Sequence, residues 1–255
     1  MARQSAKSTD IYIDRFQFET FTNSFTFTVG NNLPEVTAFG DDATTFVQGL
    51  PNADFSLNSF FSPTDDESDE IVENALSGTS EVMIAPSGIA VGNNSYEVKA
   101  NLTSRSLDNP VDGATALNTT ATATESIRRS AILYTPSSTA LTGTGVRADS
   151  RVDTGSASSI GTLSAGSTKT ATLRVTSVSG SGTATIKIQD SAHVDWAEGT
   201  GYSDFVAFSQ FSGVGTESVS TTDACDRYLQ ITVSQYSSFT NFTCMVSMGV
   251  EVGTY

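Results

Sequence analysis

The chain has 255 residues, of which 38% are hydrophobic and 16% charged, and its formal net charge is −15. A surface with 28 acidic against 13 basic side chains repels phosphate, which argues against a protein that grips nucleic acid. No segment approaches the roughly 20 apolar residues of a membrane span, and the N-terminus lacks the apolar run of a signal peptide. We therefore expect synthesis in the cytoplasm and no contact with a membrane.

Alternating apolar residues in the first third of the chain predict a series of short strands. One strand is expected over residues 21–29 and another over 54–61, where successive side chains point to opposite faces. Glycine and asparagine at 30–32 indicate a turn after the first of these strands. The residues that this pattern places in a core are Phe25, Phe27, Phe55, Leu57 and Phe61.

Residues 65–76 are expected to form the principal helix of the chain. Thr64 can act as the N-cap, and Glu67 stands three residues later, which is the arrangement of a capping box. Acidic residues crowd the first turn, where the helix dipole favours negative charge. Apolar residues at helical spacing provide the buried stripe.

The second half of the chain opens on a segment without strong patterning. Residues 135–168 are rich in Gly, Ser and Thr and are expected to be a linker or a long loop. The alternation that follows predicts a hairpin that turns at Ser179–Gly182. We therefore predict an all-β chain of two β-sandwich or barrel units: an N-terminal domain at 1–134, the linker at 135–168 and a C-terminal domain at 169–255.

The sequence contains few candidates for catalytic or metal-binding residues. His193 is the only histidine, and a surface turn explains it more simply than catalysis does. Cys225 and Cys244 have no partner at metal-ligand spacing and are expected to be free thiols. The acidic residues between 190 and 198 do not have EF-hand spacing, so a solvated turn is preferred to a calcium site. We expect no enzymatic activity, no cofactor and no metal.

Several segments resemble the major tail tube proteins of long, non-contractile-tailed phages (siphophages) and related archaeal tailed viruses. The first segments are FTNSFTFTV at 21–29 and LPEVTAFGDDATTFVQGLPNADFSLNSFF at 33–61, followed by the acidic helix. The later ones are ATLRVTSVSGSGTATIKIQDSAHVDW at 171–196 and DRYLQITVS at 226–234. The resemblance does not extend over residues 105–168.

This resemblance implies a structural virion protein, located in the viral tail, that polymerises as stacked rings into the hollow tube through which viral DNA passes. Its implied partners are further copies of itself, in trimeric pseudo-sixfold or hexameric rings, and the tape measure, tail terminator and tail tip proteins. The alternative is a capsid decoration or receptor-binding β-sandwich protein, because the C-terminal module also recurs in accessory virion proteins. A glycan-binding or hydrolytic enzyme is a third class, but nothing places two carboxylates at a working separation.

A chain that lines a DNA conduit is expected to turn part of its negative charge toward the bore, where it repels DNA and lets it slide. Loop acids beside strands are favoured over the acids of the helix, whose charge the helix dipole already accommodates. The candidates for lumen-facing residues are Asp41, Asp42, Asp54 and Asp190.

Overall fold

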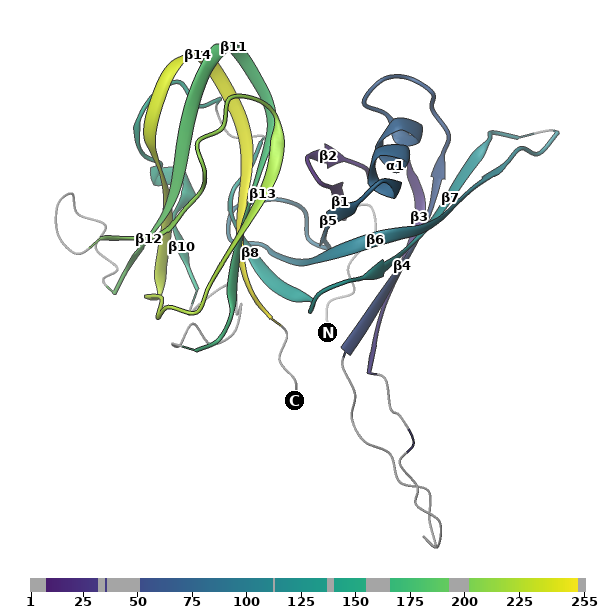
Figure 1. The fold of residues 1–255 in the computed structure, drawn as a ribbon, viewed down its shortest axis with the longest axis horizontal. Helices are drawn as coiled ribbons and strands as arrows, with labels where there is room; N and C mark the ends of the chain where they lie inside the picture. Colours follow the sequence, from purple (N-terminus) through teal and green to yellow (C-terminus); the bar gives the residue numbers. More distant parts are fainter. Residues whose placement is uncertain are drawn as a thin grey trace, which may run out of the picture. The chain divides into compact units, whose positions relative to one another are not determined.

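The computed structural model describes residues 8–31, 35, 51–111, 113–136, 140–154, 166–192 and 202–251. The described residues form an antiparallel arrangement of strands with one α-helix, which confirms the predicted all-β class with a short helix (Figure 1). None of the described residues belongs to a helix that is both long and apolar enough to cross a bilayer.

The elements of the first half of the chain are β1 (Asp10–Ile13), β2 (Phe16–Gln17), β3 (Thr22–Asn31), β4 (Pro51–Phe60), α1 (Ser68–Leu76), β5 (Thr79–Ala85), β6 (Asn94–Asp108), β7 (Ala116–Ala123) and β8 (Arg128–Tyr134). Those of the second half are β9 (Gly145–Val146), the 3-10 helix η2 (Ala148–Ser150), β10 (Val152–Asp153), β11 (Lys169–Ser191), β12 (Ser203–Ala207), β13 (Gly215–Thr221) and β14 (Tyr228–Glu251).

The chain divides into two compact units, and each is discontinuous in sequence. Unit 1 comprises Met1–Glu19, Glu81–Glu97 and Arg128–Val252, and unit 2 comprises Thr20–Ser80, Val98–Ile127 and Gly253–Tyr255. The structure therefore divides the chain differently from the predicted boundaries of 1–134, 135–168 and 169–255. The reason is strand pairing: β8 pairs with β14, and the first residues of β6 pair with β8. The N-terminal strands thereby join the same sheet as the C-terminal ones.

In unit 1, the two longest strands, β11 and β14, pair along almost their whole length (Figure 1). The predicted hairpin at Ser179–Gly182 is wrong, because β11 continues as one strand through these residues and its register with β14 shifts there. Gly180 has a φ of +83°, and a Cβ on Gly182 would lie 2.0 Å from the carbonyl oxygen of Ser237. The Ser-Gly-Ser-Gly run thus forms a bulged bend against a neighbouring strand.

This bend lets one pair of strands build both layers of a sandwich. The first part of β11 pairs with β13 and the second part with β12. Apolar side chains from both parts enclose one buried core, which includes Leu173, Val175, Ile186, Ile188, Ile231 and Val246.

Part of the predicted linker lies against this core. Leu141 is 1% exposed and forms a β-bridge with Phe242, and Val152 in β10 pairs with Leu229. The hydroxyl of Ser150 accepts a hydrogen bond from the backbone N–H of Ile231. The described residues 140–154 are therefore part of unit 1 rather than a connection between domains.

Unit 2 is built on a four-stranded antiparallel sheet in the order β3–β4–β7–β6, to which β6 contributes its residues after Glu97. Helix α1 contacts β7 and buries Ile71, Val72 and Ala75. Of the residues expected in the core, Phe55 and Leu57 are buried, whereas Phe25, Phe27 and Phe61 are half-buried. The rings of Phe27 and Phe55 stack with their centroids 4.8 Å apart.

The helix begins three residues later than predicted, at Ser68, and no capping box forms. The N-cap is Glu67, which makes no side-chain cap hydrogen bond. Asp66 has a φ of +61°, so the chain before the helix is a turn. Ser68 fixes the start instead, because its hydroxyl donates to the carbonyl of Phe60 and accepts from the N–H of Ser62.

Candidate functional surface

Twelve short polar side chains cover most of one face of the unit 2 sheet, and we call these twelve residues the polar face; the next row of the same face holds Phe60 and Ala116. The cross-strand register places twelve outward residues in three rows across β3, β4, β7 and β6. The rows are Thr28, Asp54, Thr122 and Asn101; Thr26, Ser56, Thr120 and Ser104; and Ser24, Asn58, Asn118 and Ser106. All twelve are exposed or half-buried, whereas their neighbours along β4 and β7 are buried on the other face.

The polar side chains of neighbouring strands bind one another. Between β4 and β7, the Thr122 hydroxyl donates to Asp54 Oδ1 at 2.9 Å and Asn58 Nδ2 donates to Asn118 Oδ1 at 2.5 Å. Between β7 and β6, the hydroxyls of Thr120 and Ser104 lie 2.6 Å apart. These cross-strand pairs stabilise the sheet, and they also occupy donors that would otherwise face solvent.

The polar face carries almost no charge. Asp54 is its one ionisable residue among the twelve positions. Lys99 precedes Asn101 by two residues on the same strand, and its ammonium pairs with Glu125 Oε1 at 3.1 Å. Arg105 alternates to the other face, where it pairs with Asp69 of α1. A polyanion that approaches the twelve residues meets no cation on them.

The sheet ends on one side in β3, which in the described part of the chain pairs with β4 alone. Its sequence, TNSFTFTVGN, contains no charge and no proline over ten residues. Val29 on this strand is 54% exposed. Natural proteins usually protect an edge strand with charges, prolines or bulges, because its outward N–H and C=O groups can pair with another chain. The register of β3 shifts once, between Thr22 and Ser24, and the strand is regular from Ser24 to Asn31.

The four acidic residues that were expected to face a lumen lie in different parts of the protein. Asp54 lies in the polar face, where it accepts from Thr122. Asp190 is 5% exposed, and its carboxylate accepts from the Ser203 hydroxyl and the Asp226 N–H. The carboxylate of Asp190 is thus enclosed by its hydrogen-bond partners within unit 1. Asp41 and Asp42 lie outside the described residues.

Sequence reasoning missed the polar face as a surface, although its signal was present. The alternation at 21–29 and 54–61 identifies the apolar half as the core. The other half of these strands and of β7 is Ser, Thr and Asn, with Asp54, Phe60 and Ala116 as the exceptions.

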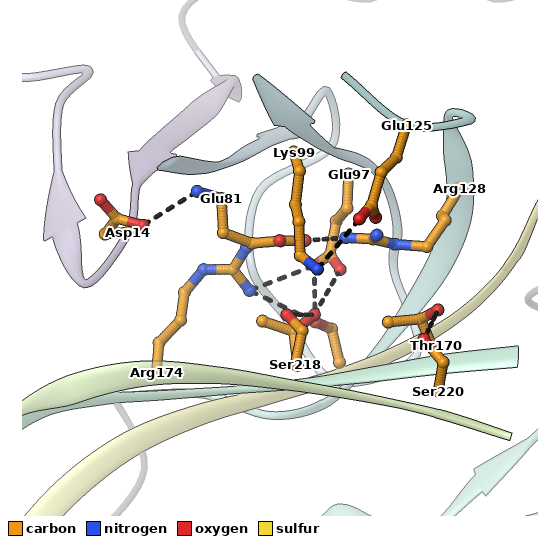
Figure 2. A network of polar contacts seen from close by, with 12 residues as sticks. Asp14, Glu81, Glu97, Lys99, Glu125, Arg128, Thr170, Arg174, Ser218 and Ser220 are labelled. Carbon is orange, nitrogen blue, oxygen red and sulfur yellow. Dashed lines mark hydrogen bonds and ion pairs between the residues drawn. The ribbon is translucent and has the colours of Figure 1, made fainter. Parts of the chain in front are cut away.

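Unit 1 buries two ion pairs that could be mistaken for an active site (Figure 2). Glu97 Oε1 accepts from Arg174 Nη1 at 3.2 Å and from the Ser247 hydroxyl at 2.5 Å, and Glu81 pairs with Arg128. Burial lowers the pKa of Arg128 to about 10, the nearby charge of Arg174 acts in the same direction, and Glu251 opposes them. With each carboxylate facing a guanidinium, the cluster holds strands together.

The two cysteines are free, as expected. Burial raises the pKa of Cys225 to about 12, and it also raises the pKa of Cys244. Thiols in this state are poor nucleophiles. Among the described residues, no group of three or more His, Cys, Asp or Glu side chains is arranged to hold a metal. His193 lies outside the described residues.

Comparison with known proteins gives no family model and no curated protein that matches the chain. Solved structures do match. The structure is similar to a protein in the virion of a native gene transfer agent particle, with 14% identity, a TM-score of 0.41 and coverage of 49% of this chain and 97% of that one. It is also similar to the SPP1 tail tube protein, with 8% identity, a TM-score of 0.41 and coverage of 50% and 78%. The SPP1 Dit protein matches with 9% identity, a TM-score of 0.36 and coverage of 96% and 99%. Of these three, the SPP1 tail tube is named for the class of protein that the sequence resembles.

Proposed function

We propose that this chain is a structural virion protein that assembles into rings and stacks them into the hollow tail tube through which viral DNA passes. The observation that carries the proposal is the polar face. It is four strands wide, its reverse side packs against α1, and its twelve residues include no cation. Such a face suits the wall of a channel for a polyanion, because it offers no site for counterion release.

The open edge of β3 supports the assembly into rings. A contact between one edge of a sheet and a different edge of the next copy is heterologous, and such contacts close into rings when the rotation allows it. Pairing would add backbone hydrogen bonds along the edge of β3 and cover Val29. With one such sheet contributed by each chain, six chains would complete a sixfold ring.

The remaining partners follow from this role. In a tail tube the chain meets copies of itself within and between rings, and at the ends of the tube it meets the tail terminator and tail tip proteins. The tape measure protein and then DNA occupy the bore. No catalytic step is part of the proposal.

Electron microscopy of the purified full-length chain, combined with one pair of matched variants, tests this function. Wild type is expected to give rings or tubes whose symmetry can be counted. Val29→Lys places a charge on the open edge and should leave the protein monomeric. Val111→Lys makes the same substitution at a side chain that is 98% exposed in the turn between β6 and β7, and it should assemble normally.

Two results would count against the proposal. Val29→Lys that assembles as well as Val111→Lys would show that β3 is not an assembly edge. Wild-type chains that stay monomeric and decorate capsids would instead support the alternative of a capsid or receptor-binding protein.

A further inference from the structure

Residues 140–154 run antiparallel to β14 and are held against it at three separate places; we call this segment the strap. At one end, Leu141 and Phe242 exchange two backbone hydrogen bonds, of 2.8 and 3.1 Å. In the middle, β9 pairs with Thr232 and Val233, and at the other end β10 pairs with the first residues of β14. The strap is thus an interrupted strand, whereas β11 pairs with β14 along almost its whole length.

Few side chains hold the strap in place. Leu141 and Val152 are its anchors in the buried core of unit 1, at 1% and 4% exposure. The Ser150 hydroxyl adds one buried contact, because it accepts from the N–H of Ile231 at 2.8 Å. Val146, between the anchors, is 47% exposed. Two apolar side chains offset only part of the conformational entropy that is lost when about fifteen residues are ordered. A segment of this kind opens before the rest of a protein unfolds.

We propose that the strap is a releasable strand, which opens from β14 while the rest of unit 1 stays folded, and that the uncovered edge of β14 binds the strap of a second copy. In the closed strap, the N–H of Phe242 donates to the carbonyl of Leu141, and the N–H of Ile231 donates to Ser150. Opening turns both N–H groups into donors of an edge strand, which can pair with another chain. The inference concerns unit 1 and does not rest on the proposed function.

The contacts of the strap identify the partner that fits this edge. An incoming strand must place one apolar side chain beside Phe242, a second one opposite Leu229 and a hydroxyl at the N–H of Ile231. The strap carries these three groups at the required spacing, and every further copy of the chain brings the same sequence. An exchange of identical segments replaces each contact with its equivalent, so it costs little once the strap is open.

Hydrogen exchange of the full-length chain, measured by mass spectrometry, tests the local opening. The strap amides of Leu141 and Arg147, which donate to β14, should exchange at least about 100-fold faster than that of Leu173 in β11. Leu141→Ala removes one anchor and should speed exchange in the strap by about 30-fold or more, with no change in β11. Val146→Ala is the matched control, because it shortens an exposed side chain of the same strap and should change neither rate.

Single cysteines on separate copies test the partner. Val152 and Leu229 lie directly opposite each other in the register of β10 and β14. In a chain that carries Cys225→Ala and Cys244→Ala, Val152→Cys is introduced into one preparation and Leu229→Cys into another. The two preparations are then mixed and oxidised. A disulfide-linked heterodimer is expected, because the strap of one copy binds the edge of β14 in the other.

The control places cysteines in a part of the sheet that should not exchange. Leu173 and Val246 lie opposite each other in the pairing of β11 with β14. Mixed copies with Leu173→Cys and Val246→Cys should form at least about tenfold less heterodimer, because these strands separate only on global unfolding.

Two results overturn the inference. The strap does not open locally if its amides exchange no faster than those of β11, or if Leu141→Ala accelerates both segments equally. The strap does not pass between copies if Val152→Cys and Leu229→Cys give no more heterodimer than the control pair.

Discussion

Glu97 and Arg174 form a hydrogen-bonded ion pair at 3.2 Å although β8 and β14 lie between their strands in the sheet. Neighbouring strands are spaced by about 4.8 Å, so in a flat sheet β6 and β11 would be about 14 Å apart. The sheet of unit 1 must therefore curl until β6 approaches β11 across its concave face. Thr172 and Ser247, which lie opposite each other on β11 and β14, also bind Glu97 and fix the same curvature.

This pair makes a first prediction about stability. Arg174→Met leaves Glu97 buried without its guanidinium and should lower the free energy of unfolding by about 3–5 kcal/mol. The double variant Glu97→Leu/Arg174→Met should recover most of that loss, because no unpaired charge remains. Urea denaturation measures both. Lys99→Met removes one partner of an exposed pair and serves as the control, with an expected loss below about 1 kcal/mol; an equal loss in both single variants would contradict the argument.

A second prediction concerns the bend in β11. A Cβ at Gly182 would overlap the backbone of Ser237 and Phe239, so Gly182→Ala should lower the free energy of unfolding by about 2 kcal/mol or more. Gly78→Ala is the matched control, since nothing lies within 4 Å of a Cβ there. Thermal melts of the two variants provide the comparison. If Gly182→Ala has the melting temperature of wild type, the close approach of β11 to β14 at this point is not required for stability.

The start of α1 gives a third prediction. Ser68→Ala removes two hydrogen bonds from a fully buried side chain and should cost about 1–3 kcal/mol. Thr64→Ala should change stability by less than about 0.5 kcal/mol, because Glu67 and not Thr64 is the N-cap. Denaturant midpoints measured in parallel distinguish the two. A larger loss of stability in Thr64→Ala than in Ser68→Ala would support the predicted capping box instead.

A fourth prediction follows from the thiols. Burial raises the pKa of Cys225 from 9.0 to about 12, so the folded protein favours the protonated thiol. Its contribution to stability is fully present below about pH 9 and is lost as pH rises toward 12. At pH 8, a thiol-specific reagent should therefore label native Cys225 much more slowly than the urea-unfolded chain. Cys225→Ser reports the background from Cys244, and rapid labelling of the native chain would contradict the burial argument.

Hydrophobic periodicity predicted the strands and the orientation of their side chains, which depend on the local sequence. It failed where pairing with a distant strand determines the structure. The alternation at 21–29 and 54–61 correctly predicted strands and the sides of Phe55 and Leu57. The glycines at 180 and 182 have turn chemistry, but pairing with β14 makes them a bulge, and no local signal reveals that partner. Arg174 occupies the polar half of its alternation and would be expected in solvent. It is buried because the sheet curls, which only the tertiary fold determines.

The discontinuity of unit 1 also sets an order of events during synthesis. Unit 2 has all four strands of its sheet once residue 127 has left the ribosome, whereas the sheet of unit 1 is completed only when β8 pairs with β14 at the far end of the chain. Domains form as units as their segments emerge during translation. The nascent chain therefore displays a finished sheet with an open strand edge while half of the protein is still unmade. Ribosomes that translate the same mRNA would bring the β3 edges of several nascent chains close together. The timing of translation would therefore influence where polymerisation starts.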